Sequence, residues 1–310
     1  MDDDFDFTKP QAAPPAAPPS PAEEAAAPSA PFKAANSQYY KPEIAEQLFR
    51  ASGKEEGFAA GQVLFVEDDK ASKGGLFSKK ASRMYFLVEG EVALTIGGRP
   101  LDTLKKGEVF GEMAVISERP RSASATARSD GLAYSLDAGE LQGALARTPE
   151  FALMLMSVMF DRLRFIAARL AQRKTALPPP VRESSVFDPP MLAQFEAALP
   201  RSATVRHWGG ANIMREGQSG AFMYVVKSGR VSIAIRDNIV EYVNAGGTFG
   251  EMALVDQSPR TATATAETEC VLLSIDRPSL LEAVKVKPAF AMAMLRAITE
   301  RLRFMNSQLS

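Results

Sequence analysis

Two stretches of the chain each set a glutamate and an arginine among small neighbours. The first reads GEVFGEMAVISERPRSASATA over residues 107–127, and the second reads GTFGEMALVDQSPRTATATA over residues 247–266. In both, the arginine follows the glutamate by nine residues, in the pairs Glu112 with Arg121 and Glu251 with Arg260. A guanidinium is a planar donor that suits phosphate oxygens, whereas a carboxylate accepts hydrogen bonds from hydroxyl groups. Together they fit a ligand that carries one phosphate close to a free sugar hydroxyl, such as a ribose 2′-OH.

The residues around these charges would let a ligand come close. A glycine precedes each glutamate, at Gly111 and Gly250, and glycine permits φ > 0 or a close backbone approach. The Glu-Met-Ala that follows predicts a short helical turn whose free N–H groups face an anion. The Ser, Thr and Ala residues after each arginine leave room and supply hydroxyl donors. An ion pair between each arginine and its own glutamate, with no ligand, is the alternative interpretation.

The two stretches belong to a long internal repeat. Phe110 aligns with Phe249 at an offset of 139 residues, and the tetrapeptide RLRF at 162–165 recurs at 301–304. Copy one carries ten extra residues, which fall in the Gly-, Ser- and Lys-rich loop Lys70–Arg83. We therefore expect two copies of one fold. The predicted divisions are an acidic, Ala- and Pro-rich disordered tail (1–38), a first domain (39–174), a Pro-rich linker (175–189) and a second domain (190–310).

The hydrophobic periodicity changes within each copy. Residues 84–96 and 223–235 hold β-branched and aromatic residues around a glycine, which predicts two strands joined by a turn. Each copy then becomes helical, with apolar residues spaced four, three and four apart. These residues are Met159, Leu163, Ile166 and Leu170 in copy one, and Ile298, Leu302, Met305 and Leu309 in copy two. Each copy is thus predicted to be a small β-barrel or roll followed by helices. We expect helices 151–172 and 290–309 to pack together in a monomer. Two alternatives remain: these apolar stripes of the helices could cover only the barrel of their own copy, or they could form a homodimer.

The composition argues against several other classes of function. The net charge is −1, so no basic field exists to hold nucleic acid or an anionic membrane. The single histidine, His207, and the single cysteine, Cys270, cannot furnish metal or catalytic centres in both copies. We expect no enzyme, a surface or packing role for His207 and a buried thiol at Cys270. The chain opens with the acidic MDDDFDF, and the apolar run 151–160 is too short to cross a bilayer, so a cytoplasmic protein is expected.

The complete pattern, Phe-Gly-Glu-Met-Ala followed by Arg-Ser/Thr-Ala, resembles the phosphate-binding cassette of the cyclic nucleotide-binding domain family. The similarity extends over residues 42–172 and 190–310. It implies an α+β fold of two tandem β-rolls, jelly-roll-like, each followed by C-terminal helices. In that family the glutamate binds the ribose 2′-hydroxyl and the arginine binds the cyclic phosphate. The implied ligand-binding residues are Phe110, Gly111, Glu112, Met113, Ala114, Arg121, Ser122 and Ala123 in domain 1, and Phe249, Gly250, Glu251, Met252, Ala253, Arg260, Thr261 and Ala262 in domain 2.

The resemblance further implies a non-enzymatic receptor without a catalytic cofactor, for which cAMP is the favoured ligand and cGMP the alternative. Ser122 and Thr261 follow the arginines, and a hydroxyl there can serve the amino group of guanine. A base-capping residue near Phe165 or Phe304 is expected from the trailing helices. Closure would move each helix and signal to a protein partner, for which the acidic and aromatic segment Asp2–Phe7 is a candidate docking peptide. A ligand-independent scaffold with vestigial pockets is the alternative function.

Two subclasses of the resembling family fit less well. Regulators of the catabolite activator protein type append a DNA-reading helix-turn-helix, whereas only residues 305–310 follow the second RLRF, so no DNA partner is expected. Regulatory subunits of cAMP-dependent protein kinase carry an Arg-Arg-x-Ser/Ala inhibitor segment in their tails. The tail of this chain offers only Lys9 and Lys33, so kinase inhibition is not expected.

Overall fold

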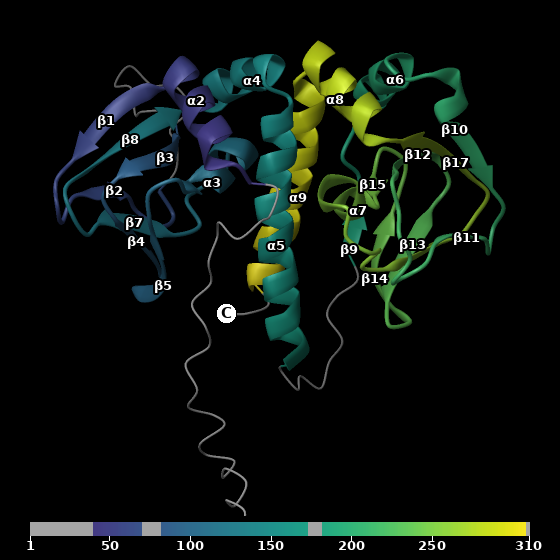
Figure 1. Ribbon diagram of the computed structural model, residues 1–310. Helices are drawn as coiled ribbons and strands as arrows, with labels where there is room; N and C mark the ends of the chain where they lie inside the picture. The colour runs from purple at the N-terminus through teal and green to yellow at the C-terminus, as the bar shows by residue number, and fades with distance from the viewer. Residues whose placement is uncertain (1–39, 70–81, 173–181, 308–310) are drawn as a thin grey trace, which may run out of the picture. The chain divides into compact units, whose positions relative to one another are not determined.

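The computed structural model describes residues 40–69, 82–172 and 182–307, and these three ranges belong to one compact unit. The predicted tail and all but the end of the copy-one loop lie outside the described residues. Each repeat builds two β-sheets, followed by helices (Figure 1). This confirms the predicted α+β fold of two β-rolls with trailing helices. Within the described ranges, no helix combines the length and apolar character that crossing a membrane requires.

The first repeat pairs a four-stranded sheet of order β1-β8-β3-β6 with another of order β2-β7-β4-β5, all antiparallel. Its strands are β1 (Lys54–Phe58), β2 (Val63–Phe65), β3 (Met84–Glu89), β4 (Val92–Ile96), β5 (Arg99–Leu104), β6 (Val109–Phe110), β7 (Ser124–Ala127) and β8 (Gly131–Leu136). Its helices are α2 (Pro42–Ser52), α3 (Glu112–Ser117), α4 (Ala138–Arg147) and α5 (Glu150–Gln172).

The second repeat has the same plan, with sheets of order β10-β17-β12-β15 and β11-β16-β13-β14-β9. Its strands are β9 (Arg182–Ser184), β10 (Thr204–His207), β11 (Asn212–Met214), β12 (Met223–Ser228), β13 (Val231–Ile235), β14 (Asn238–Val243), β15 (Thr248–Phe249), β16 (Thr263–Ala266) and β17 (Cys270–Ile275). Its helices are α6 (Pro189–Ala197), the short η1 (Arg201–Ala203), α7 (Glu251–Asp256), α8 (Arg277–Val286) and α9 (Ala289–Ser307).

A glycine in the left-handed region turns the chain between the two strands predicted in each copy. Gly90 (φ +92°) lies between β3 and β4, and Gly229 (φ +91°) lies between β12 and β13. A Cβ on Gly90 would lie 2.7 Å from the carbonyl oxygen of Asp130, so this turn needs glycine both for its φ and for its close neighbour. The two strand–turn–strand predictions are therefore confirmed.

Aromatic rings fill the interior behind the two stretches that carry the charges. Tyr85 stacks on Phe110 with 5.1 Å between ring centroids, and Tyr224 stacks on Phe249 at 5.2 Å. Offset ring contacts of this kind add to the stabilisation that burial alone provides. Cys270 is buried in the core of the second repeat, as predicted.

The trailing helices α5 and α9 pack against each other, as the spacing of their apolar residues predicts (Figure 1). The buried members of the predicted stripes are Met159, Leu163, Ile166, Ile298 and Leu302, while Met305 is half-buried. They join a hydrophobic cluster drawn from both repeats. The side chains of Leu170 and Leu309, also predicted for the stripes, lie outside the part that the structure describes.

Part of the predicted Pro-rich linker is a strand rather than a connector. Strand β9 pairs in parallel with β14, with Glu183 opposite Tyr242, and forms the edge of a sheet in the second repeat. Helix α6 then begins at Pro189. The end of the segment predicted as a linker thus contributes a strand to a sheet of the second repeat. A three-residue strand is too short to show the alternation from which strands are predicted.

Candidate functional site

Each predicted cassette starts where a short strand of the sheet gives way to a short helix. Gly111 (φ +73°) separates β6 from α3, and Gly250 (φ +78°) separates β15 from α7. A Cβ on Gly111 would lie 2.9 Å from Nη1 of Arg121, and one on Gly250 would lie 2.7 Å from Nη1 of Arg260. Both positions therefore need glycine for a left-handed φ and for the close approach of the guanidinium. The short helix predicted after each glycine is present.

The arginine of the first cassette is buried and bonded to the backbone. Arg121 donates from Nη1 to the carbonyl oxygen of Gly111 at 2.9 Å and from Nη2 to that of Arg83 at 2.8 Å. Its guanidinium carbon lies 4.0 Å from the centroid of the Phe65 ring. Only 7% of Arg121 is exposed, and burial lowers the pKa of its guanidinium.

The arginine of the second cassette has the same environment. Arg260 donates to the carbonyl oxygens of Gly250 at 2.8 Å and Phe222 at 2.7 Å, and burial again lowers its pKa. The backbone of Gly220 passes directly over the guanidinium, because a Cβ built on Gly220 would overlap it. Of the ion pairs between described residues, none involves Arg260 or its counterpart Arg121. Each repeat therefore holds a buried cation whose direct partners are backbone carbonyls.

The two glutamates are paired with arginines that the sequence did not assign to them. Glu112 forms an ion pair with Arg162 of α5. Glu251 accepts from Nη1 of Arg301 in α9 at 2.9 Å, and Glu241 of β14 also pairs with Arg301 at 2.9 Å. Burial disfavours the charge of Arg301, but the two carboxylates outweigh it and raise its pKa above the ordinary value. The alternative predicted above, an ion pair within each cassette, is therefore not the arrangement found.

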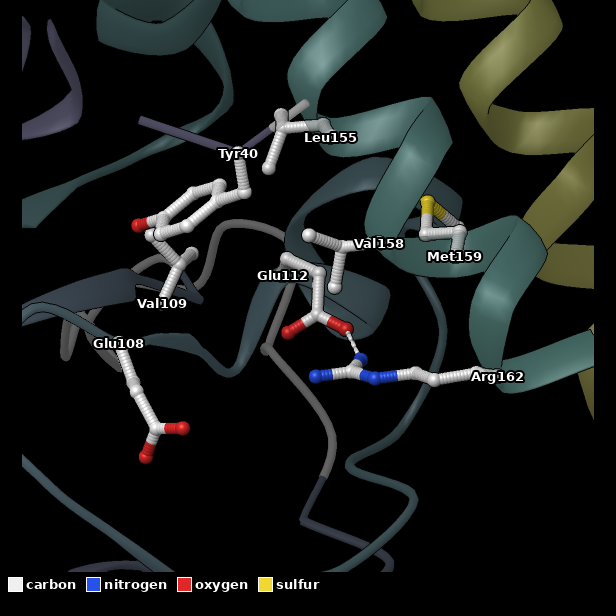
Figure 2. Close-up of a pocket in the computed structure, with 8 residues that line it drawn as sticks. All are labelled: Tyr40, Glu108, Val109, Glu112, Leu155, Val158, Met159 and Arg162. Atoms are coloured by element: carbon white, nitrogen blue, oxygen red, sulfur yellow. Dashed lines mark hydrogen bonds and ion pairs between the residues drawn. The ribbon is translucent and has the colours of Figure 1, made fainter. Parts of the chain in front are cut away.

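The first glutamate borders a small pocket beneath α5 (Figure 2). The pocket is lined by Tyr40, Glu108, Val109, Glu112, Leu155, Val158, Met159 and Arg162. Tyr40 donates its hydroxyl to the carbonyl oxygen of Gly107 at 3.0 Å, and burial, followed by the charge of Glu108, raises its pKa. Burial also raises the pKa of Glu108. The sequence pattern did not single out Tyr40 or Glu108.

The remaining predicted site residues divide into packing and surface positions. Phe110 and Phe249 are core residues, and Ala114, Ala253 and Ala262 are also buried. Met113 and Met252 are half-buried and receive weak hydrogen bonds at sulfur from Ser122 at 3.5 Å and Thr261 at 3.6 Å. Ala123 is half-buried. Of the two predicted base-capping residues, Phe304 is half-buried on α9, and the side chain of Phe165 lies outside the described part.

A metal centre has no candidate in the part of the chain that is described. No group of three or more His, Cys, Asp or Glu residues there could hold an ion. His207 is half-buried in β10, opposite Cys270 of β17. The chemistry of the cassettes is therefore that of two buried guanidinium groups and two buried carboxylates.

Comparison with known proteins yields a family match and several relatives. The model of the cyclic nucleotide-binding domain matches residues 55–148 and 208–286, more than half of the chain. A cGMP-dependent protein kinase of Toxoplasma gondii is 28% identical over 218 residues, which are 70% of this chain and 19% of the kinase. A cAMP-dependent protein kinase regulatory subunit of Eremothecium gossypii is 26% identical over 216 residues, 68% of this chain and 43% of the subunit.

A likeness to solved structures was also found. The regulatory domain of Toxoplasma gondii PKA, crystallised with cAMP, is 20% identical and covers 81% of this chain and 98% of its own, with a TM-score of 0.29. Among the curated relatives, this chain spans only 19–22% of the length of the cGMP-dependent kinases that it matches. Because the family model covers both cassettes and more than half of the residues, the chain belongs to the cyclic nucleotide-binding domain family and carries that domain twice.

Proposed function

We propose that the chain is a non-enzymatic receptor in which each repeat binds one 3′,5′-cyclic mononucleotide, with cAMP favoured over cGMP. Arg121 and Arg260 would bind the cyclic phosphate, and Glu112 and Glu251 the ribose 2′-hydroxyl. The backbone of the glycines, methionines and alanines of both cassettes would line one side of each nucleotide pocket, while Phe110 and Phe249 support that backbone from the core. The hydroxyls of Ser122 and Thr261 would face the base.

The observation that carries this proposal is the buried cation in each cassette. A charged group taken out of water is costly unless an opposite charge compensates it. Arg121 and Arg260 are 7% and 6% exposed, yet their direct partners are carbonyl oxygens, which are dipoles rather than charges. An anionic phosphate would supply the missing compensation. The same arrangement in two places argues against an accident of packing.

The ion pairs of the glutamates support a link between binding and helix position. Glu112 and Glu251 each bond to an arginine of the trailing helix, α5 or α9. A ribose hydroxyl that hydrogen-bonds to the same carboxylate would compete with that arginine. Ligand binding would thereby alter the contacts that hold the helix to its cassette. This is the step through which we propose that the receptor signals to a protein partner, with Asp2–Phe7 as the candidate docking segment.

Isothermal titration calorimetry of the full chain with cAMP, cGMP and cCMP tests the proposal. The expected result is two equivalents of a purine cyclic nucleotide per chain, with cAMP bound more tightly than cGMP. An Arg206→Met variant serves as the control, because Arg206 is an exposed arginine whose carboxylate partner Glu269 lies 3.8 Å away. The absence of binding heat with all three nucleotides would overturn the proposal and favour the ligand-independent scaffold. A pull-down with and without residues 1–38 then separates the docking segment from the receptor.

A further inference from the structure

The tetrapeptide RLRF, which occurs once in each trailing helix, has two arginines that face different partners. Successive residues of an α-helix are rotated by about 100°, so arginines two positions apart point to nearly opposite sides of the helix. The first arginine of each copy, Arg162 or Arg301, contacts the glutamate of its own cassette. The second, Arg164 or Arg303, contacts the cassette of the other repeat. Family roles for Glu and Arg within a cassette do not account for this second arginine.

In copy one, the second arginine holds the end of α7. Arg164 forms an ion pair with Asp256, the last residue of α7, and donates from Nη2 to Oγ of Ser258 at 3.2 Å. The carboxylate of Asp256 is only 6% exposed and also accepts from the backbone N–H of Ser258 at 3.1 Å. Ser258 lies two residues before Arg260, the proposed phosphate ligand. The contact therefore acts on the loop that positions the second buried guanidinium.

In copy two, the second arginine reaches the equivalent loop of the first repeat. Arg303 donates from Nη2 to the carbonyl oxygen of Pro120 at 2.8 Å, directly before Arg121. Arg296, two turns earlier on α9, donates from Nη2 to Glu118 at 2.9 Å and from Nε to the carbonyl oxygen of Ile116 at 3.2 Å. Each trailing helix thus lies between its own carboxylate and the arginine loop of the opposite repeat.

We propose that Arg164 and Arg303 are positioning residues that act across the repeats, so that filling one pocket raises the affinity of the other. The proposal rests on the proposed function. A nucleotide in the first pocket competes with Arg162 for Glu112 and loosens α5. Because Arg164 is on the same helix, its hold on the loop at Asp256 changes with it. A second nucleotide then binds to a loop that has already been released, which lowers the free-energy cost of its binding.

The two sets of contacts between the repeats should contribute unequally to this coupling. The Arg164–Asp256 pair is largely removed from water on the carboxylate side, whereas Arg296 and Glu118 are 49% and 56% exposed. Exposed pairs contribute little, and buried pairs are costly to break. Coupling free energy is shared equally by the two ligands, so loss of Arg164 alone should remove most of it.

A thermodynamic cycle on the full chain tests the inference with cAMP as the probe. The association constants of two single-pocket variants, Arg121→Met and Arg260→Met, are measured by calorimetry, and the two constants are multiplied. This product is compared with the product of the two stepwise constants of the wild type. For coupling of the usual size, the wild-type product is expected to be larger by about fivefold or more. In an Arg164→Gln background the ratio is expected to fall most of the way to one, whereas Arg164→Lys, which keeps a charge, retains more of the coupling.

The controls separate this inference from the proposed function and from a folding defect. Arg206→Gln, on the exposed surface, is expected to keep the wild-type ratio. If Arg164→Gln alone unfolds the chain, the pair Arg164→Gln/Asp256→Asn removes both charges of the buried pair and leaves only Asp161, the other partner of Arg164, whose side chain is 37% exposed to solvent. Two equivalents of bound cAMP with the same ratio in the Arg164 and Arg206 variants would overturn the coupling while leaving the receptor intact. Absence of cAMP binding in the wild type would instead refute the receptor.

Hydrogen exchange provides a second readout that a purely structural role would not move. In an Arg260→Met chain only the first pocket can fill. We expect cAMP to change amide exchange at residues 250–258 in that chain, and expect no such change once Arg164→Gln is added. An unchanged exchange pattern at residues 250–258 in both chains, with cAMP bound to the first pocket, contradicts the inference.

Discussion

Replacing the buried arginine of the first cassette with an apolar side chain of similar length distinguishes a role in folding stability from a role in ligand binding. Arg121→Met removes the charge and keeps most of the volume. In the ligand-free protein the guanidinium gives two hydrogen bonds to carbonyl oxygens and lies over the Phe65 ring, but pairs with no carboxylate among the described residues. The substitution should therefore damage binding far more than folding.

The structure sets the size of both effects. Truncating one partner of a buried, hydrogen-bonded charge pair costs about 2–5 kcal/mol of binding free energy. At about 1.4 kcal/mol per tenfold change, the first pocket should bind cAMP roughly 30-fold to several thousand-fold more weakly. A buried charge without an ion-pair partner carries an uncompensated desolvation cost, and an apolar side chain removes that cost. The carbonyls of Gly111 and Arg83 lose a donor, but both residues are half-buried rather than fully buried. We expect the free energy of unfolding without ligand to change by no more than about 1 kcal/mol.

Denaturant unfolding with and without cAMP measures both quantities on one sample. At cAMP concentrations about 100 times the dissociation constant, each occupied pocket adds about 2.7 kcal/mol to the free energy of unfolding. The Arg121→Met chain should retain only the contribution of the second pocket, and Arg206→Met should retain both. A loss of 3 kcal/mol or more in the ligand-free protein, of the order seen when a buried ion pair is broken, would show that Arg121 serves the fold. Undiminished stabilisation by cAMP would refute its role in the pocket.

Three further substitutions have outcomes that follow from single contacts. Gly220→Ala places a Cβ against the guanidinium of Arg260, so calorimetry should show weaker binding at the second pocket only. Asp276→Ala removes the side chain that caps α8 and should lower the free energy of unfolding by about 1 kcal/mol in chemical denaturation. Asp276→Asn should keep most of the stability that the cap provides, because asparagine also caps helices. The hydrogen bond from Ser279 lowers the pKa of Asp276 in the folded chain. The stability that this carboxylate contributes is therefore present above its unfolded pKa and is lost as pH falls through its lowered folded pKa. Acid denaturation of Asp276→Asn should not show that loss. Phe290→Ala, at a fully buried ring, should cost about 3–5 kcal/mol by the same assay.

The local chemistry of the cassettes could be predicted from the sequence because short-range patterns determine it. A glycine before a glutamate and an arginine nine residues later are visible in one line of sequence, and the left-handed Gly111 and Gly250 follow from them. The packing of α5 on α9 was also predicted, since a heptad-like apolar spacing needs a partner surface. These features depend on residue type and spacing alone.

The partners of the two glutamates were missed because they depend on contacts between distant segments. Glu112 meets Arg162, and Glu251 meets Arg301, each across 50 residues. The equal separation was a usable signal, since RLRF recurs at the same offset as the cassettes. Strand β9 gave no comparable signal, because three residues beside prolines cannot display a period of two. Tyr40 was missed as well, since two adjacent tyrosines before a helix form no periodic pattern.

If the glutamates bind the ribose as proposed, their ion pairs would make nucleotide binding an exchange of partners rather than the filling of an open site. In the second repeat, Arg301 contacts both Glu251 and Glu241, so it keeps one compensating carboxylate if Glu251 turns to a ribose hydroxyl. The free-energy cost of the exchange there is that of one contact within a network, and not that of leaving a buried charge unpaired. A receptor built in this way would be held in its ligand-free arrangement by the same carboxylates that are proposed to recognise the ligand. In the proposed receptor, binding would therefore release a helix, and this coupling would allow a small sugar-phosphate ring to change the surface presented to another protein.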